Sequence, residues 1–578
     1  MLLMTDAAIH LNQIGFRPGD PKQAIVAAPS PEPLPWTLER ADGRIVLKGR
    51  TSVAGDDAAT GDHVHHIAFD AAPAGRYRLK VAGAASQPFP VAPGIYRPLA
   101  HAALNFFYHQ RAGTPILARW AGEGWARPAG HAPEVAACFS GKDEAGNVWP
   151  GCDQPRDVTG GWYDAGDHGK YVVNAGISVW TLQNLYEAGF ARPLFADGQA
   201  RLPEAGNGHD DLLDEARWEV EWMLRMQVPA GTMLALPVGE PASDGRLTLV
   251  RRDAGGMAFH KVADRRWTAL PMPPADDPED RLIYPPSTAA TLNLAAVAAQ
   301  AARLWRNADP AFADRCRKAA LAAWDAAERH PRILAAQGFT GSGGYGDGQL
   351  DDDRAWAAAE LFALTGDARF ADRLGKGAVE VPNWADTGAL GTITLAVADG
   401  MPDAIRRDAR ARIVTAADGF VAEAGQSGYA IPYAGQRYAW GSNSDLLNRA
   451  MLLGLAARFT DDAKYRRAAL GAMDYVLGRN PLGQSYLTGF GWKPMQNPHH
   501  RFWAKSLDAS LPPPPPGVVS GGPNNSAMSD DVAKTLKGKC APQRCWADHI
   551  RAYALNEVTI NWNAPLVWVA AYLDSDPA

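Results

Sequence analysis

One loop of this chain reads Gly160-Gly161-Trp162-Tyr163-Asp164-Ala165-Gly166-Asp167-His168. Its glycines allow a compact turn, and its two aspartates stand three positions apart among aromatic residues. Carboxylates seldom stand beside Trp and Tyr at such a turn for packing alone. A pair of this kind can hold one water molecule against a sugar ring. That chemistry needs a further carboxyl group on the other side of the bond being cut, so we expect a partner elsewhere in the chain.

Two motifs near the C-terminus supply polar partners. One runs from Ser485 to Gly491 and continues to Pro498-His499-His500-Arg501. The other runs from Trp546 to Ala564 and contains Glu557 among apolar neighbours. Partial burial there would raise the pKa of the Glu557 carboxyl, as a general acid requires.

Each of these residues also has a purely structural interpretation. Asp164 could cap the helix that we expect to begin near His168. Glu557 could be an ordinary carboxylate on a helix surface, and the two adjacent histidines could be core residues or metal ligands. The co-occurrence of all three motifs favours the catalytic interpretation.

The pattern of apolar residues divides the chain into two domains. Residues 7–92 hold short apolar stretches separated by turns, which is typical of a small β-sandwich. From about residue 97 the pattern becomes helical, with roughly a dozen helices joined by long loops. No repeat of solenoid length is visible, and helical hairpins closed into a ring would account for the pattern. We predict domains at 1–94 and 95–578.

Composition excludes several classes of protein. The 578 residues are 47% hydrophobic and 21% charged, with a net charge of −6, as in a soluble globular protein. No basic run suggests a nucleic-acid partner, and no apolar run suggests a membrane span. The N-terminal residues do not resemble a signal peptide. We therefore expect a cytoplasmic protein if Met1 is the native start, and a secreted or periplasmic one otherwise. No oligomeric state is predicted.

The five cysteines cannot all pair within one chain. Cys316 lies in a helical pattern and is expected to be a buried free thiol. Cys138 and Cys152 bracket one loop, and Cys540 and Cys545 bracket another. Each pair is compatible with a disulfide, half of a metal site or two free thiols.

The three motifs, in this order, resemble those of glycoside hydrolase family 9, the inverting cellulases. The opening residues Leu11-Asn12-Gln13-Ile14-Gly15-Phe16 resemble the start of the immunoglobulin-like domain that precedes many catalytic domains of that family. The resemblance covers nearly the whole chain. It implies an all-β immunoglobulin-like sandwich followed by an all-α barrel of six hairpins, (α/α)6, that hydrolyses β-1,4-linked glucan with inversion.

The resemblance also implies roles for individual residues. Asp167 matches the base that activates water, Asp164 the carboxylate that helps to hold this water, and Glu557 the general acid. His499 and Arg501 match the sugar-binding pair, and Trp562 falls where the family keeps an aromatic residue near the cleavage point. Beside the aspartates, Trp162 and Tyr163 are also expected to bind the sugar; Trp162 and Trp562 could each be core residues, but their loop setting favours a sugar-stacking surface. No organic cofactor is implied.

Metal sites are implied as well. Asp352 and Asp353 lie in a segment that resembles a calcium-binding region of the family, and hard oxygen ligands suit Ca²⁺. Cys138 and Cys152 resemble part of a zinc site with two cysteines and two histidines. Phe139 stands where a histidine is expected, so the zinc set is incomplete.

The expected substrate is soluble β-1,4-glucan or cello-oligosaccharide, because the segments around Asp167 and from Cys540 to His549 resemble a subgroup that trims soluble oligosaccharides. Some members of that subgroup prefer glucosamine-containing ends, so exo-β-glucosaminidase activity on chito-oligosaccharides is an alternative. A glycan-binding protein without catalysis is a third hypothesis, which the intact set of three carboxyl residues disfavours.

Overall fold

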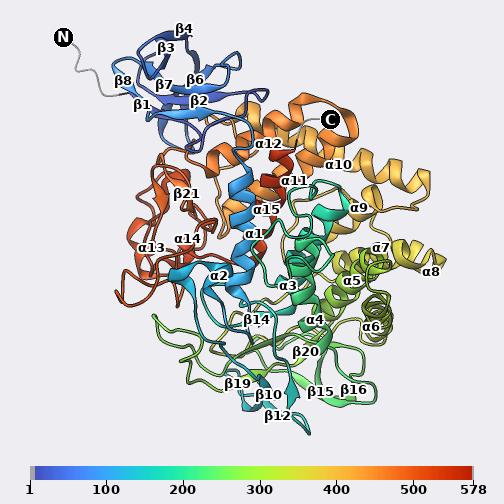
Figure 1. Cartoon of the computed structure of the whole chain (residues 1–578). Helices are drawn as coiled ribbons and strands as arrows, with labels where there is room; N and C mark the ends of the chain where they lie inside the picture. The colour runs from blue at the N-terminus through green and yellow to red at the C-terminus, as the bar shows by residue number, and fades with distance from the viewer. Residues whose placement is uncertain (1–6, 576–578) are drawn as a thin grey trace.

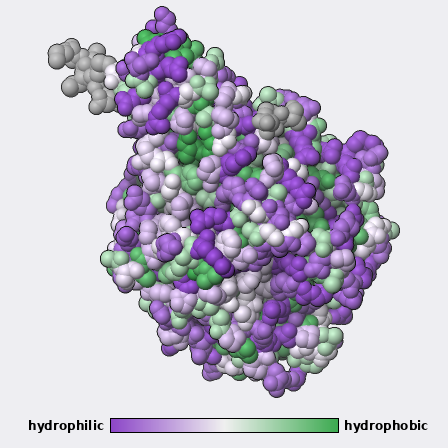
Figure 2. All heavy atoms as spheres, viewed as in Figure 1, coloured by the Kyte–Doolittle hydropathy of each residue, from purple (hydrophilic) through white to green (hydrophobic). Residues whose placement is uncertain are grey.

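The computed structural model describes residues 7–575, in which a small β domain stands on a larger helical domain (Figure 1). Strand β9 ends at Val91 and helix α1 begins at Arg97, on either side of the predicted boundary. Hydrophilic residues cover most of the face shown in Figure 2, where the small domain projects from the larger one. Within residues 7–575, no helix has the length and apolar character needed to cross a membrane.

The small domain is a sandwich of two antiparallel sheets. The first has the order β1 (Ala8–His10), β2 (Gln23–Ala27), β6 (Asp62–Ala68) and β5 (Ser52–Asp57). The second has the order β4 (Ile45–Arg50), β3 (Pro35–Arg40), β7 (Gly75–Val81) and β8 (Ala84–Ala85), with β9 (Phe89–Val91) also paired to β7. Alternate residues of β7 are buried, as expected for a strand with one face on a core.

The larger domain is mostly helical. Its long helices are α1 (Arg97–Gln110), α3 (Val172–Glu187), α4 (Asp211–Arg225), α5 (Thr288–Trp305), α6 (Pro310–Arg329), α7 (Asp351–Thr365), α9 (Gly388–Val397), α10 (Asp403–Gln426), α11 (Ser442–Thr460), α12 (Ala463–Val476) and α15 (Ile560–Asp574). Short helices are α2 (Ala118–Ala121), α8 (Ala368–Ala371), α13 (Asp531–Leu536) and α14 (Tyr553–Asn556).

Packing closes these helices into a ring. Helix α3 packs on α5, α5 on α7, α7 on α9, α9 on α10, α10 on α11, α11 on α15, and α15 returns to α3. Helices α3 and α15 are buried along most of their length, and their only charged residues, Glu187 and Asp574, stand at their C-terminal ends. A helix that is apolar all round belongs in an interior. By contrast, α6 has one buried and one exposed face and packs outside α5.

Short strands also join the helices, and the sequence analysis did not predict them. Five form one sheet in the order β13 (Arg156–Asp157), β10 (Val135–Cys138), β19 (Arg281–Ile283), β18 (Lys261–Asp264) and β14 (Lys170–Tyr171). The others pair as β11 (Ser140–Lys142) with β12 (Val148–Pro150), β15 (Met233–Val238) with β16 (Thr248–Asp253), β17 (Ala258–Phe259) with β20 (Pro286–Ser287), and β21 (Ser485–Thr488) with β22 (Pro494–Met495).

Candidate active site

The aspartate loop, residues 160–168, lies between strands β13 and β14. Its entry turn requires glycine at position 161, where φ is +77° and a Cβ atom would lie 2.6 Å from the side chain of Trp222. The Asp164 amide donates to the Gly169 carbonyl at 2.9 Å and closes the loop on itself. The pairing of β14 with β18 then anchors its end.

Backbone hydrogen bonds join the three sequence motifs. The Arg501 amide donates to the Gly166 carbonyl at 2.9 Å. The Ile560 amide donates to the Asp164 carbonyl at 2.9 Å, and the His499 amide donates to the Asn556 carbonyl at the same distance. Segments more than 300 residues apart in the sequence therefore form one rigid frame around a common space.

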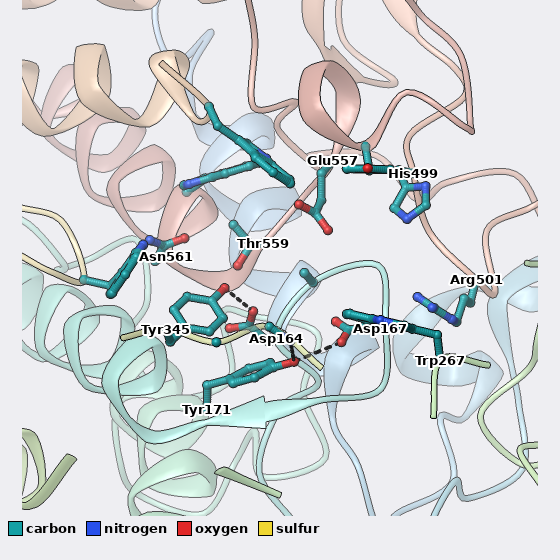
Figure 3. A pocket seen from close by; sticks show the side chains of 17 residues that line it. Asp164, Asp167, Tyr171, Trp267, Tyr345, His499, Arg501, Glu557, Thr559 and Asn561 are labelled. Carbon is teal, nitrogen blue, oxygen red and sulfur yellow. Dashed lines mark hydrogen bonds between the residues drawn. The ribbon is translucent and has the colours of Figure 1, made fainter. Parts of the chain in front are cut away.

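That space is a cavity of about 770 Å³. Figure 3 shows Glu557 on the opposite side of the cavity from Asp164 and Asp167. The cavity is lined by Asp164, Ala165, Asp167, Tyr171, Trp267, Gly343, Gly344, Tyr345, Trp384, Trp440, His499, Arg501, Tyr553, Glu557, Thr559, Asn561 and Trp562. Aromatic rings with a few convergent polar groups are typical of a site that binds a small molecule or a sugar.

Asp164 is buried, with a relative exposure of 1%. It does not cap a helix, because α3 begins at Val172 with Tyr171 at the capping position. Its carboxylate accepts hydrogen bonds from the Asn174 amide group and, at 2.6 Å, from the Tyr345 hydroxyl. Burial, with a contribution from nearby Asp167, raises the pKa of Asp164 to about 7 against the lowering effect of these bonds.

Asp167 is partly exposed to the cavity. Its carboxylate accepts one hydrogen bond from the Tyr171 hydroxyl at 3.1 Å. The Gly343 amide in turn donates to that hydroxyl oxygen at 2.8 Å, which fixes the direction of the Tyr171 proton. Among residues 7–575, none donates a hydrogen bond to the second carboxylate oxygen of Asp167, and this carboxylate faces the cavity (Figure 3).

Glu557 follows helix α14 and lies shortly before α15. Its carbonyl accepts a hydrogen bond from the Gly521 amide at 2.8 Å, which holds this short extended segment in place. Burial raises the pKa of Glu557 well above its ordinary value, and the negative charges of Asp167 and Asp164 add to the effect. A carboxyl group in this environment keeps its proton near neutral pH, as a general acid must.

His499, Arg501 and Trp562 line the cavity, where the sequence analysis expected them. His499 is oriented by a 2.7 Å contact between Nδ1 and the Ile550 carbonyl. Arg501 donates to the Thr268 hydroxyl at 2.7 Å. His500 instead turns into the protein, where its ring stacks on Trp503 with centroids 3.8 Å apart; it is a core residue.

The structure corrects the expectation that Trp162 and Tyr163 bind the sugar, because neither residue lines the cavity. Trp162 is fully buried, and its indole N–H donates to Glu215 at 2.8 Å. Tyr163 is 2% exposed, and its hydroxyl lies 2.7 Å from Nδ1 of His131. The loop points its aspartates into the cavity and these two rings into the core behind it, so they support the loop and do not contact a ligand in the cavity.

Several lining residues were missed by sequence reasoning. Tyr345 and Tyr171 orient the two aspartates, and Trp384 packs edge-on against Tyr345 with centroids 5.0 Å apart. Tyr345 lies in the glycine-rich stretch around residue 344 and has a positive φ of +47°. The stretch lies a few residues before Asp352 and Asp353, and an aromatic residue among glycines is the sequence signal that could have identified Tyr345.

The predicted calcium ligands Asp352 and Asp353 lie together, and Asp347 joins them. One carboxylate oxygen from each lies within 4.8 Å of the others. Each residue also has a buried carboxylate oxygen without a hydrogen-bond partner: Oδ2 of Asp347, Oδ1 of Asp352 and Oδ2 of Asp353. Burial and the neighbouring carboxylates raise the pKa of Asp347 to about 6 and that of Asp353 well above its ordinary value. Three unpartnered hard oxygens at this spacing fit Ca²⁺.

The predicted zinc ligands Cys138 and Cys152 are joined in a disulfide. Their sulfurs are bonded to each other and are not available as thiolate ligands, so the prediction of zinc at this pair is wrong for the structure described. Cys540 and Cys545 form a second disulfide. Cys316 is a buried free thiol, as predicted.

Comparisons with known proteins agree with this architecture. Residues 96–570 match the family Glycosyl hydrolase family 9, and residues 4–86 match the Cellulase N-terminal ig-like domain. The chain is 40% identical to a cellulose 1,4-beta-cellobiosidase of Acetivibrio thermocellus over 98% of its own length and 67% of the relative's length. It is also 40% identical to endoglucanase C of Cellulomonas fimi, over 98% of its own length and 52% of the relative's.

A solved structure extends the comparison. The crystal structure of a metagenome-derived glycoside hydrolase family 9 endoglucanase superimposes with a TM-score of 0.83 at 33% identity, covering 99% of both chains. The matching family, the similar solved structure and the carboxyl-rich aromatic cavity together identify the chain as a glycoside hydrolase. The chain belongs to glycosyl hydrolase family 9.

Proposed function

We propose that this chain hydrolyses β-1,4-glucosidic bonds of cellulose-type glucans with inversion of configuration. The observation that carries the proposal is the position of Glu557, which faces Asp164 and Asp167 across one cavity in surroundings that keep it protonated. The names of the cellobiosidase and the endoglucanase to which the chain is 40% identical support the substrate class.

In the proposed mechanism, Glu557 donates its proton to the glycosidic oxygen of the leaving sugar. Asp167 takes a proton from a water molecule, which attacks the anomeric carbon from the opposite face. Asp164 holds this water together with Asp167. The bond between the anomeric carbon and the leaving oxygen breaks as the new bond to water forms, and each carboxyl group ends in the other's protonation state.

The hydrogen bonds around the two aspartates suit these unequal roles. Asp164 already accepts bonds from Asn174 and Tyr345, whereas Asp167 accepts one from Tyr171 and keeps an oxygen toward the cavity. Because the pKa of Asp164 is about 7, Asp164 is partly protonated near neutral pH. The repulsion that would hinder ionisation of Asp167 is then reduced.

We expect His499, Arg501 and Trp562 to bind the glucan, with Trp267, Trp384 and Trp440 as further aromatic surfaces. A second hollow continues the cavity and shares Trp384, Trp440, Asn561 and Trp562 with it. A cleft of this extent suits a chain of several sugars, and we propose soluble glucan or cello-oligosaccharide as the substrate.

The exo-β-glucosaminidase alternative requires a carboxylate for the ammonium group of the sugar. Among the described residues that line the two hollows, the only carboxyl group besides the proposed catalytic three is that of Asp445. This group is already paired with Arg449 at 2.8 Å. A free carboxylate for an amino sugar is therefore lacking in this lining, and we favour glucan.

The test is a product time course on cellohexaose, with the anomeric form followed by proton NMR. Inversion predicts that α-anomers appear first, and the product lengths separate trimming from an end from internal cutting. Early β-anomers would contradict the proposed mechanism. Cleavage of chitosan oligosaccharides in place of cellohexaose would favour the glucosaminidase, and binding without cleavage of either would favour a glycan-binding protein.

The finer architecture and the cofactor requirement are also proposals. We propose that the closed ring of helices is the (α/α)6 barrel of six hairpins. We further propose that Asp347, Asp352 and Asp353 bind Ca²⁺, which would neutralise three crowded carboxyl groups at the start of α7. The reaction itself needs only protein carboxyl groups and water, and no organic cofactor.

A further inference from the structure

A second cluster of ligand-type side chains lies behind the aspartate loop. It consists of His131, His168 and Asp277, and one candidate ligand atom of each lies within 4.8 Å of the others. None of the three lines the cavity. We propose that this His–His–Asp cluster binds a divalent transition-metal ion of the zinc class.

The cluster is buried and has an unused nitrogen atom. The side chains of His131 and His168 are 7% and 3% exposed, and that of Asp277 is fully buried. Nε2 of His131, which lies 3.7 Å from Oδ2 of Asp277, is buried without a hydrogen-bond partner. Unpaired polar atoms are rare in protein interiors because water can no longer satisfy them. A bound cation would supply the partner that the His131 nitrogen lacks.

The contacts of His131 match those of a metal-bound histidine. Its Nδ1 lies 2.7 Å from the Tyr163 hydroxyl, and its Nε2 lies 3.7 Å from Oδ2 of Asp277. When Nδ1–H donates to the tyrosine oxygen, the lone pair of Nε2 points toward the carboxylate. Histidine ligands are commonly held in this way, with the second ring N–H donating to an oxygen. Tyr163, which the sequence analysis expected to contact sugar, supplies the oxygen that accepts this hydrogen bond.

Protonation and charge are compatible with a cation here. Burial lowers the pKa of both histidines, so the rings are neutral, as metal ligands must be. Positive charges do face the cluster from Arg127, Lys170, Arg281 and Arg501. Two of them are already neutralised: Arg281 is paired with Glu134 and Asp264, and Lys170 is paired with Glu134.

The ligand types select the class of ion. Two imidazoles and one carboxylate suit Zn²⁺ and its neighbours in the transition series, whereas Ca²⁺ and Mg²⁺ prefer oxygen ligands only. At present Nδ1 of His168 is 2.5 Å from Oδ2 of Asp277. Ligands about 2.1 Å from a tetrahedral ion lie about 3.4 Å apart. The ion would therefore take the place of the proton that His168 and Asp277 share, and these two side chains would move apart. The proton would move to Nε2 of the His168 ring, and water would complete the coordination of the ion.

Such an ion would join three loops around the site. His168 directly follows Asp167, and His131 precedes strand β10. Asp277 lies in the loop between β18 and β19, which also carries Trp267 of the cavity wall. The ion would therefore brace the aspartate loop against this wall from behind, without touching the sugar.

The experiment measures metal binding by the whole chain and is independent of hydrolysis. The oxidised protein is stripped with a chelator, supplied with Ca²⁺ to fill oxygen-only sites, and titrated with Co²⁺ or Zn²⁺. We expect one equivalent of Co²⁺ with the visible absorption of a low-coordinate nitrogen and oxygen site and no thiolate charge-transfer band. Saturating Zn²⁺ should raise the Tm by about 3 °C.

Two variants locate the ion. Asp277→Asn and His131→Gln should each lose the Co²⁺ absorption and the Zn²⁺ shift in Tm, with folding checked by circular dichroism. The control Asp352→Asn, in the other acidic cluster, should keep both. Retention of the signals in Asp277→Asn, or a thiolate band, would overturn the proposal. Should both variants fail to fold, the wild type decides, because a spectrum without visible cobalt bands rejects the site.

Discussion

Gly166 and His499 touch backbone to backbone. A Cβ atom on residue 166 would lie 2.2 Å from the carbonyl oxygen of His499, closer than any real contact. The Gly166 carbonyl also accepts the amide hydrogen of Arg501 at 2.9 Å. Because Gly166 has no side chain, the aspartate loop can lie directly against the segment that carries His499 and Arg501. This contact fixes the position of the proposed base relative to the proposed sugar-binding pair.

Gly166→Ala should therefore damage activity more than stability. The methyl group must push the two backbones apart, which costs about 1–3 kcal/mol of unfolding free energy. A shift of about 1 Å in the aspartate loop should lower kcat about 100-fold. Thermal melts and cellohexaose kinetics measure the two effects. In the control Gly419→Ala, the new methyl group on exposed helix α10 meets nothing within 4 Å; it should leave kcat unchanged.

Glu557→Gln should remove the proton donor while preserving shape. We expect turnover of unactivated glucan to fall about 100- to 10,000-fold, which is the range that general acid catalysis contributes. Binding of cellohexaose, measured by calorimetry, should persist. Glu240→Gln serves as the control, since this exposed residue only pairs with Arg332 on the surface. A Glu557→Gln enzyme with a near-normal rate would exclude Glu557 as the acid.

Asp164 should make stability depend on pH. Its folded pKa of about 7 lies above its ordinary value of 3.8, so the folded protein binds more protons between these values. Its contribution is therefore present at low pH and is lost as the pH rises from about 4 through about 7, by up to about 4 kcal/mol.

Asp164→Asn should remove that part of the pH dependence. An amide oxygen can still accept from Asn174, and the amide nitrogen can face the Tyr345 hydroxyl, which can rotate to accept. Urea unfolding at pH 5 and pH 7 should show a smaller loss of stability in the variant than in the wild type. Equal losses would show that Asp164 ionises as freely when folded as when unfolded. Activity should also fall, since the proposed water loses one acceptor.

Calcium removal should lower the Tm, and added Ca²⁺ should restore it, because the ion separates three crowded carboxyl groups. Asp352→Asn should abolish this dependence. Asp351→Asn is a closely matched control: this neighbouring residue is exposed and lies outside the cluster. A wild-type Tm that is indifferent to both chelator and Ca²⁺ would reject the calcium proposal.

The sequence predicted the three carboxyl residues of the site better than it predicted the residues that surround them. Asp164, Asp167 and Glu557 are recognisable because the chemistry demands carboxyl groups in particular local contexts. Which side of a loop faces the cavity is decided by tertiary packing, however, and Trp162 faces Glu215 for that reason. Tyr345 lies 181 positions from its partner Asp164, and no local pattern encodes such a pairing.

The same distinction holds for the fold. Apolar helices such as α15 and the alternating strand β7 are predictable because burial imposes a period on the sequence. The two-residue strand β14 is not, because it exists only through its pairing with β18. The acidic cluster was predicted with two members, and Asp347 was missed because a loop brings it to the start of α7.

Removal of residues 1–92 should destabilise the helical domain. At the interface Arg466 donates to Asp20 at 2.8 and 3.0 Å, and Arg544 donates to Asp62 at 2.7 and 2.9 Å. The Asn12 side chain also donates to the buried carboxylate of Asp474 at 2.8 Å. Truncation leaves these groups without partners and exposes the apolar surface around them, and unpaired buried charges are costly.

We expect the truncated chain to melt at a lower temperature and to aggregate, as measured by calorimetry and light scattering. Asp62→Asn in the full chain is the milder companion variant and should lower the unfolding free energy by about 1–3 kcal/mol, because it leaves Arg544 without its charged partner. Arg544 immediately precedes the disulfide-linked Cys545, at the start of the segment that leads to Glu557. Loosening there should therefore also reduce activity. A stable truncated chain with the full rate on cellohexaose would show that the sandwich contributes neither stability nor alignment.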